Sequence, residues 1–92
     1  HPRTGGLGPM KMTLKLYAVL GQYLPEHAQK NAAEIEVDPE MTVLGVLADH
    51  GVPPENCHLV LVNGIYCAPS ERAEKILNEG DALAVWPPVA GG

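Results

Sequence analysis

Leu59-Val60-Leu61-Val62-Asn63-Gly64-Ile65-Tyr66-Cys67 is the stretch that decides the fold of this chain. Its apolar run ends in Asn-Gly, the dipeptide that most strongly favours the two-residue loop of a β-hairpin. With such a loop, Val62 faces Ile65 and Leu61 faces Tyr66 across the two strands. The stretch therefore predicts a strand, a tight turn and a shorter return strand.

Two segments near the start of the chain alternate apolar and polar residues, which is the period of a half-buried strand. The first covers residues 12–18 and places Tyr17 on its polar face, and the second covers residues 34–37. We expect these two strands to pair as a loose hairpin. The connection over residues 19–33 is mostly polar, with a short helical turn expected around residues 26–30.

A helix is predicted after the second strand, with Thr42 as its N-cap and Gly51 as the left-handed residue that ends it. Apolar residues recur between them at helical spacing, and we expect Leu44 and Leu47 to pack on the sheet. Gly45 weakens this helix by about 1 kcal/mol relative to alanine. Two prolines soon after Gly51 prevent the helix from continuing.

The remainder of the chain adds one more strand. Residues 70–73 predict a single helical turn capped by Ser70, residues 78–81 predict a turn, and residues 82–86 form the last strand. The element order is then strand, strand, helix, strand, short strand, strand. This order predicts the α+β class and a β-grasp fold, a mixed sheet of four to five strands with one main helix across one face.

One helix covers only one face of such a sheet, so we expect the other face to bind a partner. Trp86 lies there, and tryptophan is enriched at the energetic centres of interfaces. The pattern leaves open whether Val60 and Val62 or Leu59 and Leu61 share this face, and we assign the first pair to it. The predicted partner-binding residues are Tyr17, Val60, Val62, Ala84, Trp86, Pro87, Pro88 and Val89.

The chain ends in Gly91-Gly92, a tail tip without side chains. Backbone without Cβ atoms passes through channels in which any other residue would clash. Pro87-Pro88 precede this tip and hold φ near the polyproline value, so the tail should leave the fold extended. We interpret the tail as a stalk that delivers the terminal carboxylate into the active site of another protein.

The length of 92 residues favours one domain. We expect residues 1–9 to be a disordered cloning remnant and residues 10–92 to form the domain, with a flexible tail over residues 87–92. From Met10 onward the chain holds five basic and eleven acidic side chains, a formal charge of −6. Nucleic acid is excluded as a partner because phosphate binding needs a basic face. No apolar run is long enough to span a membrane, and no signal-peptide pattern is found.

Cys57 and Cys67 are the only two cysteines, which excludes zinc or iron–sulfur sites built from four thiolates. In the hairpin register above, Cys57 would lie opposite Ser70, which argues against a disulfide between the cysteines. We expect both to be ordinary small apolar residues in a cytoplasmic protein. No metal site and no bound cofactor are predicted.

The element order, the Asn78-Glu79-Gly80-Asp81 turn and the ending Trp86-Pro87-Pro88-Val89-Ala90-Gly91-Gly92 resemble the ubiquitin-like sulfur carriers. These are the small subunit of molybdopterin synthase and the sulfur carrier of the thiamine pathway, the MoaD/ThiS family. The resemblance covers residues 10–92. Its most specific part is Gly-Asp, a short apolar strand, Pro-Pro-Val, one small residue and a terminal Gly-Gly.

The resemblance implies a function for the tail. In this family an ATP-dependent adenylating enzyme activates the terminal carboxylate, here that of Gly92, and sulfur then replaces the adenylate to give a thiocarboxylate. The carrier inserts its tail, with Gly91 clearing the channel, into an acceptor synthase large subunit. The chain would accordingly be a carrier subunit without a catalytic site of its own, with molybdopterin as the favoured pathway.

Several alternatives stay open from the sequence. One is a thiamine-pathway carrier, and another is a ubiquitin-like modifier, which would share the chemistry up to the adenylate but be conjugated to lysines. A third is a domain that binds through its sheet with an inert tail. A thiol enzyme is disfavoured because Cys57 and His58 are adjacent on a strand and point to opposite faces. A ferredoxin-type electron carrier is excluded because it needs four cysteine ligands.

Overall fold

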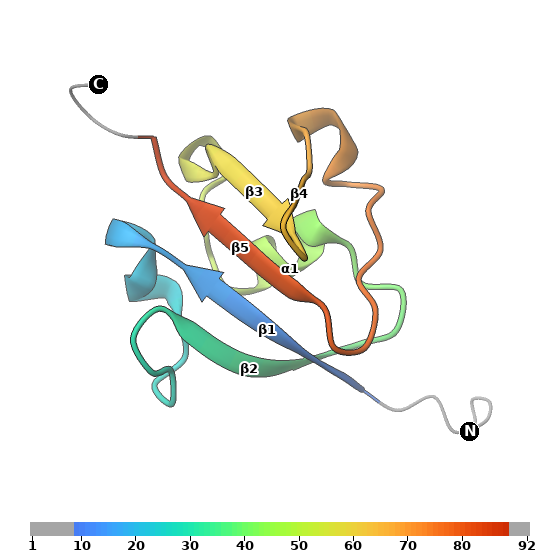
Figure 1. Ribbon diagram of the computed structural model, residues 1–92, viewed down its shortest axis with the longest axis horizontal. Coiled ribbons are helices and arrows are strands. Elements are labelled where there is room, and N and C mark those ends of the chain that lie inside the picture. The colour runs from blue at the N-terminus through green and yellow to red at the C-terminus, as the bar shows by residue number, and fades with distance from the viewer. Residues whose placement is uncertain (1–8, 89–92) are drawn as a thin grey trace.

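The computed structural model describes residues 9–88, which form one sheet backed by one α-helix (Figure 1). Of the predicted remnant it describes only Pro9, and of the predicted flexible tail only Pro87 and Pro88. The strands and the helix are β1 (Met10–Leu16), β2 (Ala32–Val37), α1 (Val43–Asp49), β3 (Leu59–Val62), β4 (Ile65–Tyr66) and β5 (Ala82–Trp86). Short 3₁₀ helices are η1 (Ala18–Tyr23), η2 (Pro54–Asn56) and η3 (Pro69–Glu71).

The five strands lie in the order β2-β1-β5-β3-β4. β1 runs parallel to β5, and the other neighbouring strands are antiparallel. The first and last strands of the chain therefore lie side by side within the sheet, with β2 on one side and the β3–β4 hairpin on the other. This topology with one crossing helix confirms the predicted β-grasp fold.

The hairpin of β3 and β4 has the predicted register, with Val62 opposite Ile65 and Leu61 opposite Tyr66. Both loop residues have positive φ, 54° at Asn63 and 82° at Gly64, as the tight turn requires. The Asn63 side chain donates to Asp81 Oδ1 at 2.9 Å and accepts from the backbone N–H of Ala82 at 2.9 Å. One side chain thus shapes the turn and also fastens it to the start of β5.

The helix begins and ends as predicted. Thr42 Oγ1 accepts a hydrogen bond from the backbone N–H of Gly45 at 3.0 Å, and Gly51 has φ of 76°. A Cβ on Gly45 would lie 2.6 Å from Met41 Sδ and 3.2 Å from Thr42 Oγ1. The glycine that weakens the helix is therefore the residue that lets Met41 and the N-cap pack against it.

The prediction that Leu44 packs on the sheet is wrong, because 38% of this residue is exposed. The buried stripe consists of Val43, Val46 and Leu47, which have the i, i+3, i+4 spacing of one helical face. Leu44 lies at the side of that stripe, outside the contact with the sheet.

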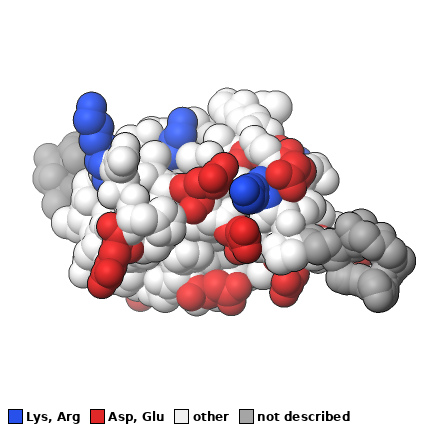
Figure 2. All heavy atoms as spheres, turned by 90° about the horizontal axis from the view of Figure 1, so that it is seen from below, with Lys and Arg blue, Asp and Glu red and all other residues white. Residues whose placement is uncertain are grey.

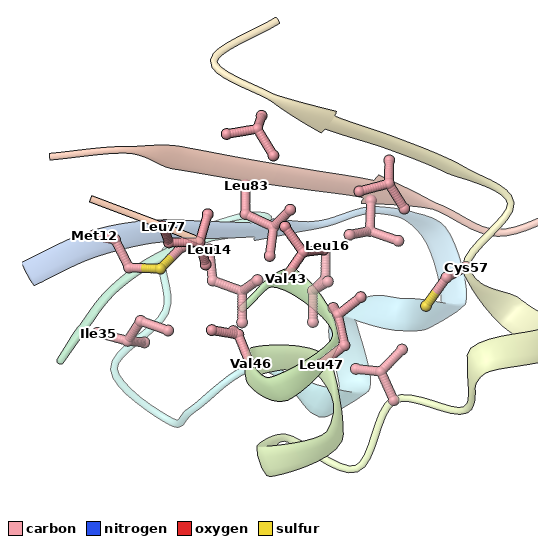
Figure 3. Close-up of a cluster of buried hydrophobic side chains, with 14 of the residues drawn as sticks. Met12, Leu14, Leu16, Ile35, Val43, Val46, Leu47, Cys57, Leu77 and Leu83 are labelled. Atoms are coloured by element: carbon pink, nitrogen blue, oxygen red, sulfur yellow. The ribbon is translucent and has the colours of Figure 1, made fainter. Parts of the chain in front are cut away.

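The core lies between α1 and the sheet face toward it (Figure 3). Alternate residues of β1 and β5 point into it, so each central strand contributes every second side chain. The fully or almost fully buried large residues are Met12, Leu14, Leu16, Leu20, Val43, Val46, Leu47, Val60, Leu77, Leu83 and Val85.

The connection between β1 and β2 differs from its prediction. The helical segment is η1, which begins directly after Tyr17 and buries Leu20 completely. The helical turn expected around residues 26–30 is only a turn closed by Ala28 N–H to Pro25 O at 3.0 Å. Similarly, the helical turn expected at residues 70–73 begins at Pro69, and Ser70 does not cap it. The position of η1 follows from the burial of Leu20 in the core, which local propensity does not report.

Arg72 is buried, with 6% of its surface exposed, and its guanidinium donates to three backbone carbonyls. The acceptors are Cys67 O at 3.3 Å, Cys57 O at 2.7 Å and His58 O at 3.5 Å. One side chain thus joins the segment before β3 to the segment after β4. Without Arg72 these carbonyls would lack a donor, because they have no partner strand at these positions.

Replacing Arg72 with methionine should therefore lower the free energy of unfolding by about 3 kcal/mol or more, since several buried carbonyls lose their donor at once. Urea denaturation followed by circular dichroism measures this change. Lys75→Met is the matched control on the same loop, because Lys75 is exposed, and its effect should stay within about 0.5 kcal/mol. Equal losses in both variants would contradict the role assigned to Arg72.

Candidate functional site

The sheet face that α1 leaves uncovered is called the open face here (Figure 1). One row of paired residues crosses all five strands on this face, as the strand register shows. The row runs Ala32, Lys15, Ala84, Leu61, Tyr66. Apart from the lysine, this row is apolar or aromatic. The part of the open face over β1 and β2 also carries Lys11, Thr13, Glu34 and Glu36, so the face is apolar over β5, β3 and β4 and charged over β1 and β2.

Tyr17 and Trp86 form the end of the open face from which the tail departs. Their rings are stacked, with centroids 4.4 Å apart and planes 3° from parallel. The Tyr17 backbone N–H also donates to Val85 O at 3.1 Å, which extends the pairing of β1 with β5 by one residue. The last strand residue before Pro87 is thus held by its ladder and by an aromatic neighbour.

Leu59 completes this end of the open face, because it lies opposite Trp86 in the β3–β5 ladder and is 36% exposed. Pro87 is half-buried and Pro88 is exposed. Neither proline has a backbone N–H, so the ladder of β5 has no donor beyond Trp86 in these two residues. The backbone therefore leaves the sheet at a defined point.

The predicted site residues divide into three groups. Tyr17, Ala84, Trp86 and the two prolines lie on the open face or at its end, with Ala84 only 9% exposed between its neighbours. Gly91, Gly92 and Val89 lie outside the described residues. The remaining two, Val60 and Val62, are in the core.

The assignment of Val60 and Val62 to the open face is a wrong prediction. They are 0% and 5% exposed and point toward α1, while Leu59 and Leu61 point to the open face. Neither valine is therefore available to a partner on the open face.

Two exposed residues, one on this surface and one in the segment that follows Tyr17, were missed from the sequence. Tyr66 is 54% exposed beside Leu61, and the hairpin register, which places it opposite Leu61, was a signal for it. Val19 is 64% exposed in η1, two residues after Tyr17. No pattern in the sequence indicates Val19, because its exposure follows from the turn at Ala18, whose φ is 54°.

The surface at the β2 edge of the molecule is mainly acidic. Figure 2 looks at the edge formed by β2 and shows acidic side chains across that surface with few lysines between them. Glu34 and Glu36 project from β2 and are exposed. Such a surface attracts a basic partner over distances of about 10 Å at moderate salt.

The two cysteines do not form a reactive site. Both are free and buried. Burial raises the pKa of the Cys57 thiol and likewise that of Cys67, in each case as the largest cause, so both favour the unreactive protonated form. His58 is exposed while Cys57 is buried, which is the opposite-face placement expected of neighbours in an extended segment. Among residues 9–88, no group of three metal-ligating side chains comes together.

The described part of the chain contains no helix long and apolar enough to cross a membrane. The longest regular helix, α1, has 7 residues.

Comparisons with known proteins agree with this architecture. The family model described as the ThiS family matches residues 20–92. No curated protein matches the sequence. Among solved structures, the HVO 2177 protein of Haloferax volcanii has a TM-score of 0.70 and 26% identity, over 92% of this chain and 89% of its own.

Two further structures share the fold. SAMP1 of Haloferax volcanii has a TM-score of 0.61 and 29% identity, over 89% of this chain and 99% of its own. A Pyrococcus furiosus protein, named as a candidate molybdopterin converting factor subunit 1, has a TM-score of 0.62 and 21% identity, over 87% of this chain and 99% of its own.

The contribution of the Tyr17–Trp86 stack to the free energy of unfolding should be measurable. Tyr17→Leu is expected to lower the free energy of unfolding by about 1 kcal/mol, because a stacked aromatic pair contributes about 0.5–1.5 kcal/mol beyond its burial. Tyr17→Phe keeps the ring and should be close to the wild type. Urea denaturation followed by the fluorescence of the single tryptophan reports the change. Equal stabilities of the leucine and phenylalanine variants would mean that the stack contributes nothing.

Proposed function

The chain belongs to the ThiS family, and from this membership we propose that it is a sulfur carrier whose reactive group is the terminal carboxylate of Gly92. As a member of a family of small ubiquitin-like carriers, it is a substrate of other enzymes and has no catalytic site of its own. The single observation that carries the proposal is the placement of Trp86. This residue ends a central strand, is stacked on Tyr17, and is followed at once by Pro87-Pro88.

That placement supports delivery because a reactive tip is useful only if its base is rigid. The base here is the parallel pair of β1 and β5, in which Leu16 is opposite Val85. Orientation of a reacting group by a rigid support is worth several kcal/mol of a reaction barrier, so a fixed base contributes to transfer. The two terminal glycines would then enter an active site that larger residues cannot reach.

The chemistry follows from the weakness of a carboxylate as an electrophile. In the proposed sequence, a Gly92 carboxylate oxygen attacks the α-phosphate of ATP, giving the acyl-adenylate and pyrophosphate. A sulfide or persulfide sulfur then attacks the acyl carbon, and AMP leaves with the bonding electrons. With a persulfide donor, a thiol supplies the electrons that cleave the S–S bond. The product is a thiocarboxylate, and covalent activation has divided one difficult transfer into easier steps.

The partners that this scheme requires are an adenylating enzyme and an acceptor synthase large subunit. We propose that both bind the open face, because its exposed apolar residues surround the exit of the tail. Trp86 and Leu59 lie closest to that exit. The acidic surface around the face would speed the approach of a basic partner.

We favour molybdopterin synthesis as the pathway that receives the sulfur. Support comes from the long connection between β1 and β2 and from the aromatic residue before Pro-Pro, features in which the chain resembles the small subunit of molybdopterin synthase. The Pyrococcus furiosus structure carries a name from that pathway. The thiamine pathway is the alternative within the same chemistry.

A protein modifier is the second candidate function. The observation that favours it is the 29% identity with SAMP1, where SAMP denotes a small archaeal modifier protein. A modifier shares the adenylate with a sulfur carrier, but a lysine amine takes the place of sulfide as the attacking group. The described fold serves both functions equally well.

A cytoplasmic location is proposed with either function. It fits the two buried cysteines, which are free thiols although they lie in the same part of the fold. Oxidising compartments favour pairing of such residues where geometry allows it.

The docking part of the proposal has its own test. Trp86→Ala should weaken binding to the activating enzyme of the same organism by about 2 kcal/mol or more, as truncation of a buried interface tryptophan commonly does. Isothermal titration calorimetry measures the affinity. The matched control is Ile76→Ala, since Ile76 is also apolar and 46% exposed but pairs with Thr42 beside α1. Similar losses in both variants would place the interface elsewhere.

Intact mass spectrometry tests the reactive group. After incubation with ATP, a sulfide source and the activating enzyme, exchange of one terminal oxygen for sulfur is expected. A variant with one alanine added after Gly92 should fold normally and remain unmodified. Conjugates joined to lysine through Gly92, without the sulfur product, would favour the modifier. Sulfur acquired by the extended variant would rule out the Gly92 carboxylate as the reactive group.

A further inference from the structure

A second surface lies at the edge of the sheet around β4, and we call it the β4 groove. It is a hollow of about 380 Å³ beside the brown η3 segment of Figure 1. Its floor contains the buried residues Val62 and Cys67. The lining residues are Val62, Asn63, Ile65, Tyr66, Cys67, Glu71, Glu74 and Lys75.

The apolar side chains of β4 are unusually exposed for large residues in a strand. Ile65 is 72% exposed and Tyr66 is 54% exposed, although both belong to a strand. Ile65 lies opposite Val62, so it continues the apolar helix-side face of β3 beyond the edge of the core. Large exposed apolar side chains gathered at one place commonly mark a binding surface.

The backbone of β4 is free on its outer side. β4 is the last strand of the sheet order, and the N–H of Cys67 donates inward to Val60 O at 2.8 Å. Alternation along the strand then directs the N–H and C=O of Tyr66 outward. Within residues 9–88 neither of these two groups has a hydrogen-bond partner. An added strand would pair with both.

The charges around the groove define what kind of strand it fits. Glu71 and Glu74 line it together with Lys75, and all three are exposed. Glu71 Oε1 also accepts from the backbone N–H of Ala68 at 2.9 Å, which holds that side chain in place. The groove therefore has a net negative charge in a protein that is itself acidic, and a basic segment complements both.

From these three features we propose that the β4 groove binds an extended segment of a partner protein in which an apolar residue has lysine or arginine two positions away on either side. The segment adds a strand beside Tyr66, and these three side chains share the face that points into the groove. The apolar side chain contacts Ile65, and the basic side chains face Glu71 and Glu74. This is binding by strand addition, in which backbone hydrogen bonds give affinity and side-chain pockets give specificity.

The β4 groove lies at the opposite end of β5 from the tail. Val62 is opposite Leu83 near the start of β5, whereas Leu59 is opposite Trp86 at its end. A segment bound in the groove therefore does not cover the exit of the tail. The proposal goes beyond carrier function, since the protein would be held by one partner while its tail enters another, and it stands whether the tail receives sulfur or is joined to lysine.

The test uses the probe peptide acetyl-Lys-Thr-Val-Thr-Lys-amide, in which the valine and both lysines share one face, titrated into the ¹⁵N-labelled protein. We expect saturable shifts of the amide signals of Ile65, Tyr66 and Glu74, with those of Tyr17 and Trp86 unchanged. The same peptide with glutamate in place of lysine should not bind. Ile65→Ser should remove measurable binding, and its unchanged spectrum elsewhere would show that the variant folds.

A charge-neutralising pair of variants tests the electrostatic part. Glu74→Gln should raise the Kd of the peptide roughly two- to fivefold, the range for an exposed ion pair. Glu55→Gln, an exposed carboxylate in η2 outside the groove, should leave it unchanged. The proposal is overturned by the absence of shifts, by shifts confined to Tyr17, Leu59 and Trp86 at the tail end of the open face, or by equal binding of the glutamate peptide. Shifts of the same β4 signals on concentrating the protein alone would also overturn it, because the occupant would then be a second copy.

Discussion

The parallel pairing of β1 with β5 is the constraint on which the rest of this structure depends. It joins the first strand of the chain to the last, with Leu14 opposite Leu83 and Leu16 opposite Val85. Both strands send alternate side chains into the core under α1, so the pairing and the core form together. Extended by one residue, the same pairing brings Tyr17 against Trp86 and determines where the backbone leaves the sheet. The tail that we propose to carry the reactive carboxylate thus begins at the end of a strand that is paired on both sides.

A single short helix has consequences for the remainder of the sheet. α1 has only 7 residues and covers one face, so the core cannot extend to the opposite face. The chain has few large apolar side chains beyond those in the core. This is expected of a small domain, whose surface is large relative to its volume. Of the large apolar residues left exposed, Leu59 lies at the tail end of the open face and Ile65 and Tyr66 lie along β4, whereas Leu44 and Ile76 lie at α1. The two proposed partner surfaces are built on the first three.

The loops show how the fold is kept together where ladders end. Arg72 joins the segments around β3 and β4 through three carbonyl groups, and Asn63 fastens their turn to β5. Both side chains replace backbone partners that a larger sheet would supply. Neither contributes to the chemistry of the tail. Their role is to keep β3 and β4 in register, and with that register Leu59, Leu61 and Tyr66 stay on the open face.

The sequence by itself determined the local features whose signals lie within a few residues. The Asn63-Gly64 turn, the N-cap at Thr42, the left-handed Gly51 and the alternation in β1 and β2 each follow from backbone conformation or from a period, and the structure has all of them. Their order was enough for the β-grasp fold, and the ending of the chain was enough for the family. Trp86 and Tyr17 were correctly placed together because both occupy the face opposite the apolar side of their strands.

Only the tertiary structure decided which faces and edges are covered. All four residues of β3 are apolar, so a period of two carries no information about whether Val60 or Leu61 is buried; the pairing with β5 decides it. Leu44 has the composition of a core residue but lies one position outside the buried stripe of α1. The burial of Arg72 and the exposure of Ile65 depend on segments distant in the sequence. Whether a residue is buried depends on what packs against it. The period of a sequence predicts the buried face only where the opposite face is polar.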